Sequence, residues 1–178
     1  MSSSSTQQKL APIRVVVDGY NLLFVSGAMG KVGSADDLER SRNRVLDLLL
    51  EYLPTELAGR TIVVFDAPRF RRSDVIEEST HGAIHVVFAK RHAEADDLIE
   101  EMIRNHPQPR KLTVVSGDRR IRIAARRRRA RDVDSETWWT KLEMNRLKIE
   151  SPDPNQQPEE EKPTVDDDDT DWFDVFRS

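Results

Sequence analysis

The sequence predicts a single α/β domain built on a mostly parallel sheet with helices on both faces. Short runs of β-branched and other apolar residues alternate along the chain with segments of helical periodicity. Strands that are apolar throughout are typical of a parallel sheet buried on both sides. The chain has 178 residues, 37% of them hydrophobic, which is enough for one domain with a substantial core.

Four strands and four helices are expected along the chain. The strands are predicted at residues 13–17 (IRVVV), 61–65 (TIVVF), 83–88 (AIHVVF) and 112–116 (LTVVS). The helices are predicted at about 35–53, 95–105, 119–130 and 136–148.

Capping signals support two of these helices. Ser34 followed by Asp37 fits a capping box at the start of the first helix, and Ser135 is a candidate N-cap for the last one. Trp138, Trp139 and Leu142 on the last helix are expected to pack in the core.

Composition divides the chain into three parts. Residues 1–12 are rich in Ser and Gln, and residues 150–178 combine Pro, Glu, Gln and a run of Asp, so both are expected to be disordered. The folded domain is expected over residues 13–149. The acidic tail ends in an apolar cluster, Trp172, Phe173, Val175 and Phe176, which we expect to dock on this domain or on a partner protein.

The charges are unevenly distributed between the domain and the tail. From Ser151 to Ser178 there are ten acids and two bases, a net charge of −8, whereas the remaining 26 bases and 22 acids give the rest of the chain +4. We expect the domain to meet a polyanion and the tail to compete with it.

Several classes of function are excluded by composition. The chain has no apolar run long enough for a membrane span or a secretory signal, so we expect a cytoplasmic protein with no membrane partner. It has no cysteine, which rules out a thiolate zinc site and a cysteine nucleophile.

Carboxylates follow the strands at the edge where ligands bind in such folds. Asp18, Asp66 and Asp118 come directly after three of the predicted strands, and the segment after the fourth places Glu94, Asp96 and Asp97 around the first turn of a helix. In an open parallel sheet, ligands bind beyond the carboxyl ends of the strands. Four separate segments therefore deliver acids to one place.

An aspartate after a strand is often only a turn residue or a helix N-cap, but its recurrence at four segments favours a binding site. Clustered carboxylates repel one another, so such a site binds cations or holds acids of raised pKa. Oxygen ligands favour Mg²⁺ or Mn²⁺. Asn21 is placed to add an amide oxygen or to orient a phosphate or water, and Ser116 lies beside Asp118.

Four motifs in order carry a family resemblance: DGYN, FDA, EADDLIE and SGD. The region from about Ile13 to Ile149 resembles the NYN domain, a branch of the PIN-like ribonucleases, and most of all its YacP-like subgroup, with the acidic tail outside the pattern. The resemblance implies a three-layer PIN-like fold and a divalent-metal-dependent endoribonuclease of RNA processing or decay.

The resemblance also implies roles for individual residues. It places Asp18, Asp66, Asp96 and Asp118 in a metal-binding, catalytic cluster with Asn21 beside it. Glu94, Asp97 and Ser116 are expected to support this cluster from outside it. The site would then perform metal-assisted hydrolysis without a covalent enzyme intermediate.

Two basic segments are predicted to bind the RNA backbone. Residues 119–131 contain eight arginines in thirteen positions; we assign phosphate contacts to Arg119, Arg120, Arg126, Arg127, Arg128 and Arg129. Arg69, Arg71 and Arg72 form a second basic loop, in which Phe70 can stack on an unpaired base. The expected partner is therefore single-stranded RNA, and association with the ribosome is left open.

Two alternative functions remain at this stage. The first is a non-catalytic RNA-binding module of the same fold. The second is a phosphatase of the haloacid dehalogenase type, in which an aspartate after the first strand is the nucleophile. That chemistry needs a second acid two positions later, where this chain has Tyr20.

Overall fold

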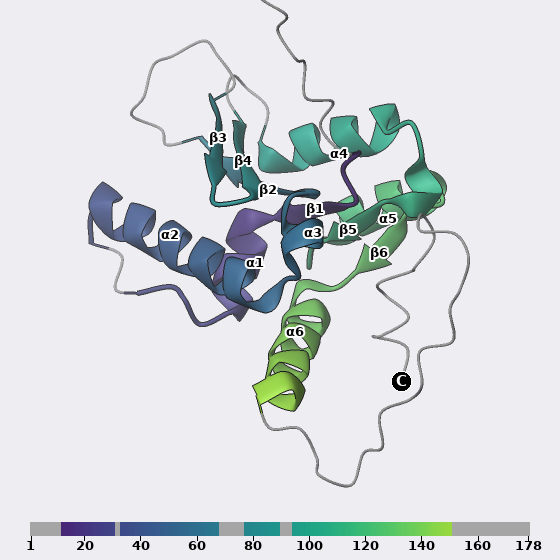
Figure 1. Cartoon of the computed structure of the whole chain (residues 1–178). Helices are drawn as coiled ribbons and strands as arrows, with labels where there is room; N and C mark the ends of the chain where they lie inside the picture. Colours follow the sequence, from purple (N-terminus) through teal and green to yellow (C-terminus); the bar gives the residue numbers. More distant parts are fainter. Residues whose placement is uncertain (1–11, 31–32, 68–76, 90–93, 151–178) are drawn as a thin grey trace, which may run out of the picture.

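The structure of the protein is a computed structural model that describes residues 12–30, 33–67, 77–89 and 94–150. Figure 1 shows a central sheet with helices packed around it. In chain order the elements are β1 (Val15–Asp18), α1 (Gly19–Val25), α2 (Ala35–Tyr52), α3 (Thr55–Ala58), β2 (Thr61–Asp66), β3 (Glu77–His81), β4 (Ile84–Ala89), α4 (Ala95–Asn105), the 3-10 helix η1 (Pro109–Lys111), β5 (Thr113–Val115), α5 (Arg119–Arg127), β6 (Arg131–Val133) and α6 (Ser135–Glu150).

The predicted α/β class with a mostly parallel sheet is confirmed. The strand order is β3-β4-β2-β1-β5-β6. All neighbouring strands pair in parallel except β3, which is antiparallel to β4. β1, β2 and β5 therefore lie side by side in the middle of the sheet, and their carboxyl ends point the same way.

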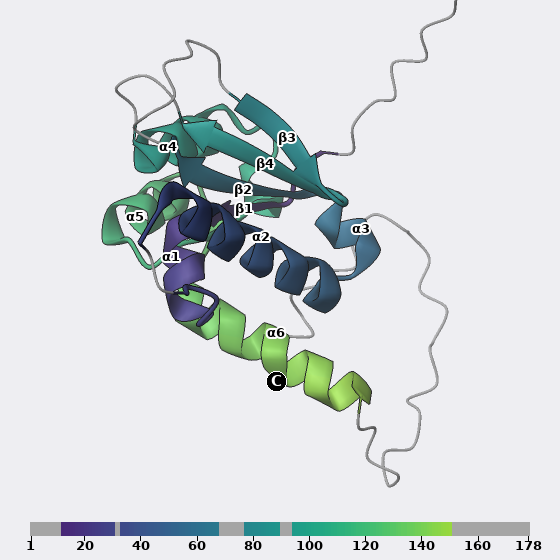
Figure 2. The same ribbon diagram turned by 90° about the vertical axis from the view of Figure 1, so that its left-hand side faces the viewer.

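The sheet separates two cores because side chains of a strand alternate between its faces. Val15 and Val17 belong to a core with α1, α2 and α6. Val16 belongs to a second core, which includes Ile99 of α4 and Ile121 of α5. Figure 2 shows α2 and α6 side by side below the strands of the sheet. The fold thus has the three expected layers.

The capping prediction for α2 is confirmed and the one for α6 is wrong. Ser34 is the N-cap of α2, and its Oγ accepts a hydrogen bond from Asp37 N at 3.2 Å. At α6 the capping side chain is Asp134, which accepts from Thr137 N at 3.2 Å. Ser135 is instead the first residue of the helix and is fully buried. Trp138, Trp139 and Leu142 are buried as predicted.

The predicted helix over 119–130 is too long. α5 ends at Arg127, and Arg129 adopts a positive φ of 60° just after it. That left-handed residue turns the chain, and Arg131 starts the edge strand β6. The sequence also gave no signal for β3, because its residues, EESTH, are polar and form an edge strand paired on one side only.

Candidate active site

Asp18 is the most buried acid of the candidate site. It ends β1, caps α1 and is 7% exposed. Its Oδ1 accepts a hydrogen bond from Asn21 N at 3.2 Å, and its Oδ2 accepts one from the Ser116 hydroxyl at 2.9 Å. Burial raises the pKa of Asp18, while these hydrogen bonds act in the opposite direction.

Asp118 is oriented by the start of α5. Its Oδ1 accepts hydrogen bonds from Arg120 N at 2.5 Å and Ile121 N at 3.4 Å. The backbone N of Asp118 donates to Ser116 Oγ at 3.0 Å. Ser116 therefore links the acid after β1 with the acid after β5.

Asp66 connects β2 to α4. Its Oδ1 accepts a hydrogen bond from Ala95 N, in the first turn of α4, at 2.6 Å. The contact spans 29 positions of sequence and fixes the start of α4 against the end of β2. The next residue along α4 is Asp96, so this hydrogen bond also positions a fourth carboxylate.

Asp96 shows that the four acids converge. Its pKa is raised to about 6, first by loss of hydration and then by the negative charges of Asp18, Asp118 and Asp66. Three strand ends and one helix therefore place carboxylates close enough to interact electrically. When no cation offsets the charge, this repulsion favours the protonated form of Asp96.

Glycines at two positions allow neighbouring side chains to pack directly against the backbone of the site. A Cβ on Gly117 would lie 2.5 Å from Asn21 Oδ1, so the Asn21 side chain rests directly against the backbone between Ser116 and Asp118. A Cβ on Gly19 would lie 2.4 Å from the buried Phe65 ring. The glycine in DGYN and the one in SGD are thus needed for close approach, and Asn21 lies at the acidic cluster as predicted.

The remaining acids on α4 have different surroundings. Asp97 accepts a hydrogen bond from Arg120 Nη2 at 2.6 Å, and Glu100 Oε1 lies 2.6 Å from Arg120 Nε. Glu94 precedes α4 in the N-cap position, and its side chain makes no capping hydrogen bond. Arg120 is therefore engaged by α4 and ties this helix to α5 beside the acidic cluster.

The carboxylate oxygens of the candidate site suit a hard divalent cation, although they do not form a complete set of metal ligands. Among the residues that the structure describes, no three His, Cys, Asp or Glu side chains are grouped as a metal site. The acids nevertheless offer only oxygen ligands and mutually repelling negative charges, which suit Mg²⁺ or Mn²⁺. Mg²⁺ keeps several waters and needs only one or two protein carboxylates, so the spread of the acids is compatible with such an ion.

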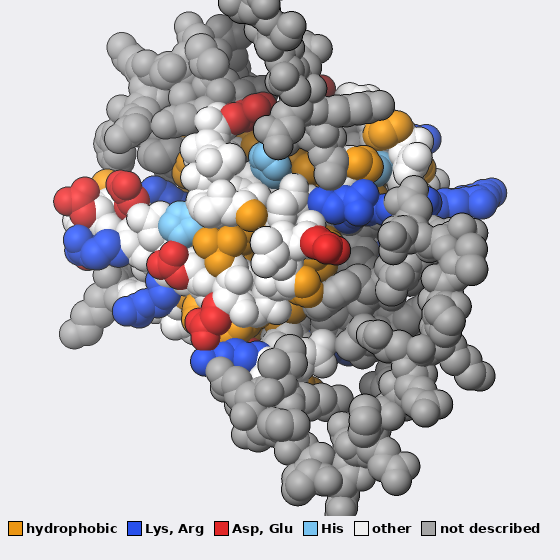
Figure 3. Space-filling view, viewed as in Figure 1, with side chains coloured by type: hydrophobic (Ala, Val, Ile, Leu, Met, Phe, Trp, Pro, Cys, Tyr) orange, Lys and Arg blue, Asp and Glu red, His pale blue; other side chains and the backbone are white. Residues whose placement is uncertain are grey.

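The arginines of residues 119–131 do not all lie at the acidic cluster. Arg119 and Arg120 start α5 beside Asp118, whereas Arg126 to Arg129 lie at its other end. There, Arg128 Nη2 is 3.5 Å from His106 O, and His106 Nε2 is 2.9 Å from Ile13 O, before β1 begins. These four arginines thus lie toward the amino-terminal ends of the strands, away from the acidic cluster. Figure 3 shows Lys and Arg side chains on that side of the molecule and others over α2 on the opposite side.

Some of these arginines have structural partners. Arg126 Nη2 lies 2.7 Å from Asp132 Oδ2, and Arg122 Nε lies 3.2 Å from the same oxygen. Arg127, Arg128 and Arg129 are exposed. The second basic loop, with Arg69, Phe70, Arg71 and Arg72, lies outside the described residues, as does the tail cluster at Trp172, Phe173 and Phe176.

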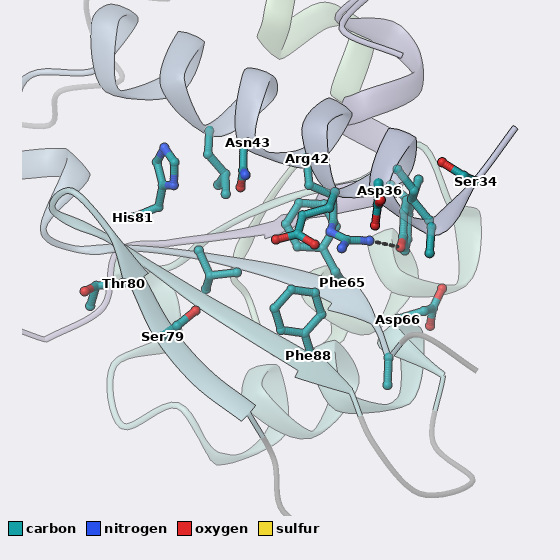
Figure 4. A pocket seen from close by; sticks show the side chains of 17 residues that line it. Ser34, Asp36, Arg42, Asn43, Phe65, Asp66, Ser79, Thr80, His81 and Phe88 are labelled. Atoms are coloured by element: carbon teal, nitrogen blue, oxygen red, sulfur yellow. Dashed lines mark hydrogen bonds between the residues drawn. The ribbon is translucent and has the colours of Figure 1, made fainter. Parts of the chain in front are cut away.

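A pocket of about 780 Å³, with Asp66 in its lining, was not predicted from the sequence. It runs between α2 and the β3–β4 hairpin, with Asp66 and Ser34 toward one end and His81 and Thr80 toward the other. Arg42, Phe65 and Phe88 lie in its middle (Figure 4). Phe65 and Asp66 belong to the FDA motif, but Arg42 and Phe88 come from distant segments that carry no motif, so only the fold brings these residues together.

Tyr20 also lines the pocket and packs against its aromatic residues. Its ring makes an edge-to-face contact with Phe65, with the ring centroids 5.3 Å apart, and its hydroxyl accepts a hydrogen bond from Arg42 Nη1 at 3.2 Å. Tyr20 supplies no carboxylate, so the second acid of a haloacid dehalogenase site is missing at this position.

A sheet with carboxylates gathered beyond the ends of its central strands is the arrangement expected of a PIN-like nuclease fold. The chain belongs to the YacP-like NYN domain family, whose sequence model matches residues 15–173. The match extends past residue 149, where we ended the resemblance, and includes Trp172 and Phe173. The inference that the acidic tail lies outside the family pattern is therefore wrong.

Solved structures agree with this assignment. The crystal structure of Rae1 (YacP) from Bacillus subtilis is 25% identical, with a TM-score of 0.54 over 79% of this chain and 78% of that chain. The structure of a tryptophan-to-leucine variant of Rae1 is also 25% identical, with a TM-score of 0.53 over 79% and 80% of the two chains. No curated protein matches the sequence. Among the described helices, none is long and apolar enough to cross a membrane.

Proposed function

We propose that this protein is a divalent-metal-dependent endoribonuclease that cleaves single-stranded RNA. The observation that carries the proposal is the placement of Asp18, Asp66 and Asp118 after three neighbouring parallel strands, with the first turn of α4 and its Asp96 hydrogen-bonded to Asp66. The raised pKa of Asp96 in the field of the other three acids agrees with this placement. Four acids that repel one another weaken the fold unless a cation offsets their charge. Membership of a family with a PIN-like nuclease fold, in which RNA is the expected partner, supports the same conclusion.

The protein's own groups are oriented for hydrolysis. Asp18, Asp66 and Asp118 each accept a hydrogen bond through Oδ1 from a backbone N–H in the first turn of a helix. These hydrogen bonds fix the orientation of the three carboxylates. Asp18, Asp66, Asp96 and Asp118 would hold Mg²⁺ or Mn²⁺, which supplies water activation and charge stabilisation when bound. Asn21, pressed against Gly117, is placed to orient the phosphate or the attacking water.

The test is a cleavage assay on unstructured, end-labelled RNA with Mg²⁺, Mn²⁺ or EDTA. We expect internal cuts with a divalent ion and none with EDTA, and a loss of at least about 100-fold in rate for Asp18→Asn and Asp96→Asn. Glu143→Gln changes an exposed acid on α6 and serves as the matched control with unchanged rate. Full activity in both aspartate variants would refute the proposal.

The non-catalytic RNA-binding module remains the second candidate. It predicts RNA binding that is indifferent to EDTA and no cleavage in either metal. Because the described acids do not form a finished ligand set, the same assay with both metals is needed to separate the two candidates.

A further inference from the structure

The pocket between α2 and the β3–β4 hairpin contains a buried cation with unused donors. Arg42 is 8% exposed. Its Nη1 donates to Tyr20 Oη at 3.2 Å, and its guanidinium carbon lies 5.4 Å from the centroid of the Phe88 ring. Among the described residues, no carboxylate forms an ion pair with it. A guanidinium has five N–H donors, so Arg42 presents free donors to the pocket.

The same pocket offers flat apolar surface beside these donors. Phe88 is half-buried and stacks on Phe65, with the ring centroids 5.8 Å apart. Figure 4 shows Arg42, Phe65 and Phe88 grouped around one space. Aromatic rings and arginine planes are the surfaces on which unpaired bases stack.

The rim of the pocket favours a base over a phosphate. Asp36 and Glu39 of α2 line the pocket and are exposed, and Ser79 and Thr80 of β3 add hydroxyl groups. Carboxylates at the rim repel a phosphate, but they accept hydrogen bonds from the amino groups of a base. Together with the donors of Arg42, they match the mixed donor and acceptor edge of a nucleobase.

The pocket is also continuous with the candidate active site. Asp66, one of the four acids, lies in its lining, and Tyr20 follows Asp18 by two residues. A volume of about 780 Å³ is in the range of ligand pockets, roughly 300–1,000 Å³. An RNA strand with a phosphate at the acidic cluster can therefore place a neighbouring base in this space.

We propose that this pocket binds one unpaired nucleobase next to the scissile phosphate, with Arg42 donating hydrogen bonds to the base and Phe88 supporting it by stacking. The proposal rests on the proposed function, because it takes RNA as the substrate. It adds a reason for preferring single strands, since a base in a duplex is stacked and paired and cannot enter the pocket.

The first test measures binding in EDTA, where no cleavage is needed. A short unstructured RNA and an abasic ribose-phosphate oligomer of equal length carry the same charge but differ in their bases. We expect the full-length wild-type protein to bind the RNA about 5- to 100-fold more tightly than the abasic oligomer. Equal affinities would overturn the proposal, because they would show recognition of phosphate alone.

Variants on α2 and β4 assign this difference to the pocket. Arg42→Lys keeps the charge but not the planar donors, and Phe88→Leu removes the ring; each should reduce the preference for bases to less than about twofold. Arg44→Gln changes an exposed arginine of the same helix outside the pocket and should leave the preference intact. If the preference persists in both pocket variants, bases are recognised elsewhere on the protein and the proposal is wrong.

A cleavage series separates this proposal from the proposed nuclease activity. Single abasic positions are placed on each side of the cut in an otherwise unchanged RNA. With Mg²⁺ we expect one position to lower kcat/KM in the wild type and to have little further effect in Arg42→Lys. Base-dependent binding without cleavage would support the pocket and refute the nuclease, whereas cleavage with no base dependence would do the reverse. If the Arg42 variant fails to fold, as judged by its Tm, the wild-type comparisons still decide.

Discussion

The Ser116 hydroxyl donates a hydrogen bond to Asp18 Oδ2 at 2.9 Å, across 98 positions of sequence. It joins the end of β5 to the end of β1, and Ser116 Oγ also accepts from Asp118 N. A side chain from another strand therefore acts on the buried Asp18 carboxyl, because burial raises the pKa of Asp18 and this hydrogen bond lowers it.

The first prediction follows from this contact. Ser116→Ala removes the donor, so we expect the pKa of Asp18 to rise and the pH at which cleavage appears to move upward. Leaving a buried acceptor unsatisfied also lowers the free energy of unfolding by about 1–3 kcal/mol. Rates measured across pH check the shift, and thermal unfolding checks the stability.

Thr61→Val is the control for Ser116→Ala. Thr61 is a fully buried residue whose hydroxyl donates to Leu57 O at 2.7 Å at the start of β2, away from the acids. It should lose stability with no shift in the pH profile. An equal shift in both variants would mean that lost stability, and not Asp18, controls the profile.

The second prediction concerns stability against pH without metal. The pKa of Asp96 is about 6 in the folded protein and 3.8 without the fold's influence. The folded state then binds this proton more tightly, so stability is gained as pH falls from about 6 toward 4 and lost as it rises. Asp96→Asn should remove this part of the pH dependence.

At neutral pH, Asp96→Asn should stabilise the metal-free protein while abolishing cleavage. Much of the Asp96 side chain meets solvent, which screens the repulsion, so we expect a rise in Tm of roughly 2–4 °C, the effect of about 1 kcal/mol in a domain of this size. Thermal unfolding in EDTA and in Mg²⁺ provides the measurement. A variant less stable than the wild type in EDTA at pH 7 would contradict the assignment of Asp96 to a repulsive cluster.

The third prediction uses the glycine at the site. A Cβ on Gly117 would approach Asn21 Oδ1 to 2.5 Å, so Gly117→Ala should displace the Asn21 side chain and reduce cleavage at least about tenfold, a change of about 1.4 kcal/mol. Gly59→Ala adds a Cβ whose nearest neighbour is 3.8 Å away and should leave the rate unchanged. Equal rates in the two variants would show that the position of Asn21 does not matter for the reaction.

The positions of Asp18, Asp66 and Asp118 could be predicted because each follows a strand that is apolar throughout. Runs of valine mark the strands that precede Asp18 and Asp118, and the parallel sheet then brings the two acids together. The pocket had no such signal. Arg42 reads as one more charged residue of a helix, and its burial depends on β4, which lies more than 40 positions later. Likewise, the distance of each arginine from Asp118 depends on the direction of α5. This helix runs from the carboxyl ends of the strands back toward their amino ends.

The last prediction concerns Arg129, which has a left-handed backbone with φ of 60°. Glycine is the residue usually found in this conformation after a helix, and for other residues it costs about 1–2 kcal/mol. Arginine at such a position is a local conflict of the kind that occurs at functional sites. We therefore expect Arg129→Gly to raise the free energy of unfolding by up to about 1 kcal/mol and to weaken RNA binding, with a shallower dependence of affinity on salt because one phosphate contact is lost.

Arg126→Gln is the comparison variant. Because Arg126 is paired with Asp132, this substitution should lower stability more than RNA affinity. Affinities measured at several salt concentrations, together with thermal unfolding, test both variants. An unchanged salt slope in Arg129→Gly would show that this exposed side chain is not used to bind RNA.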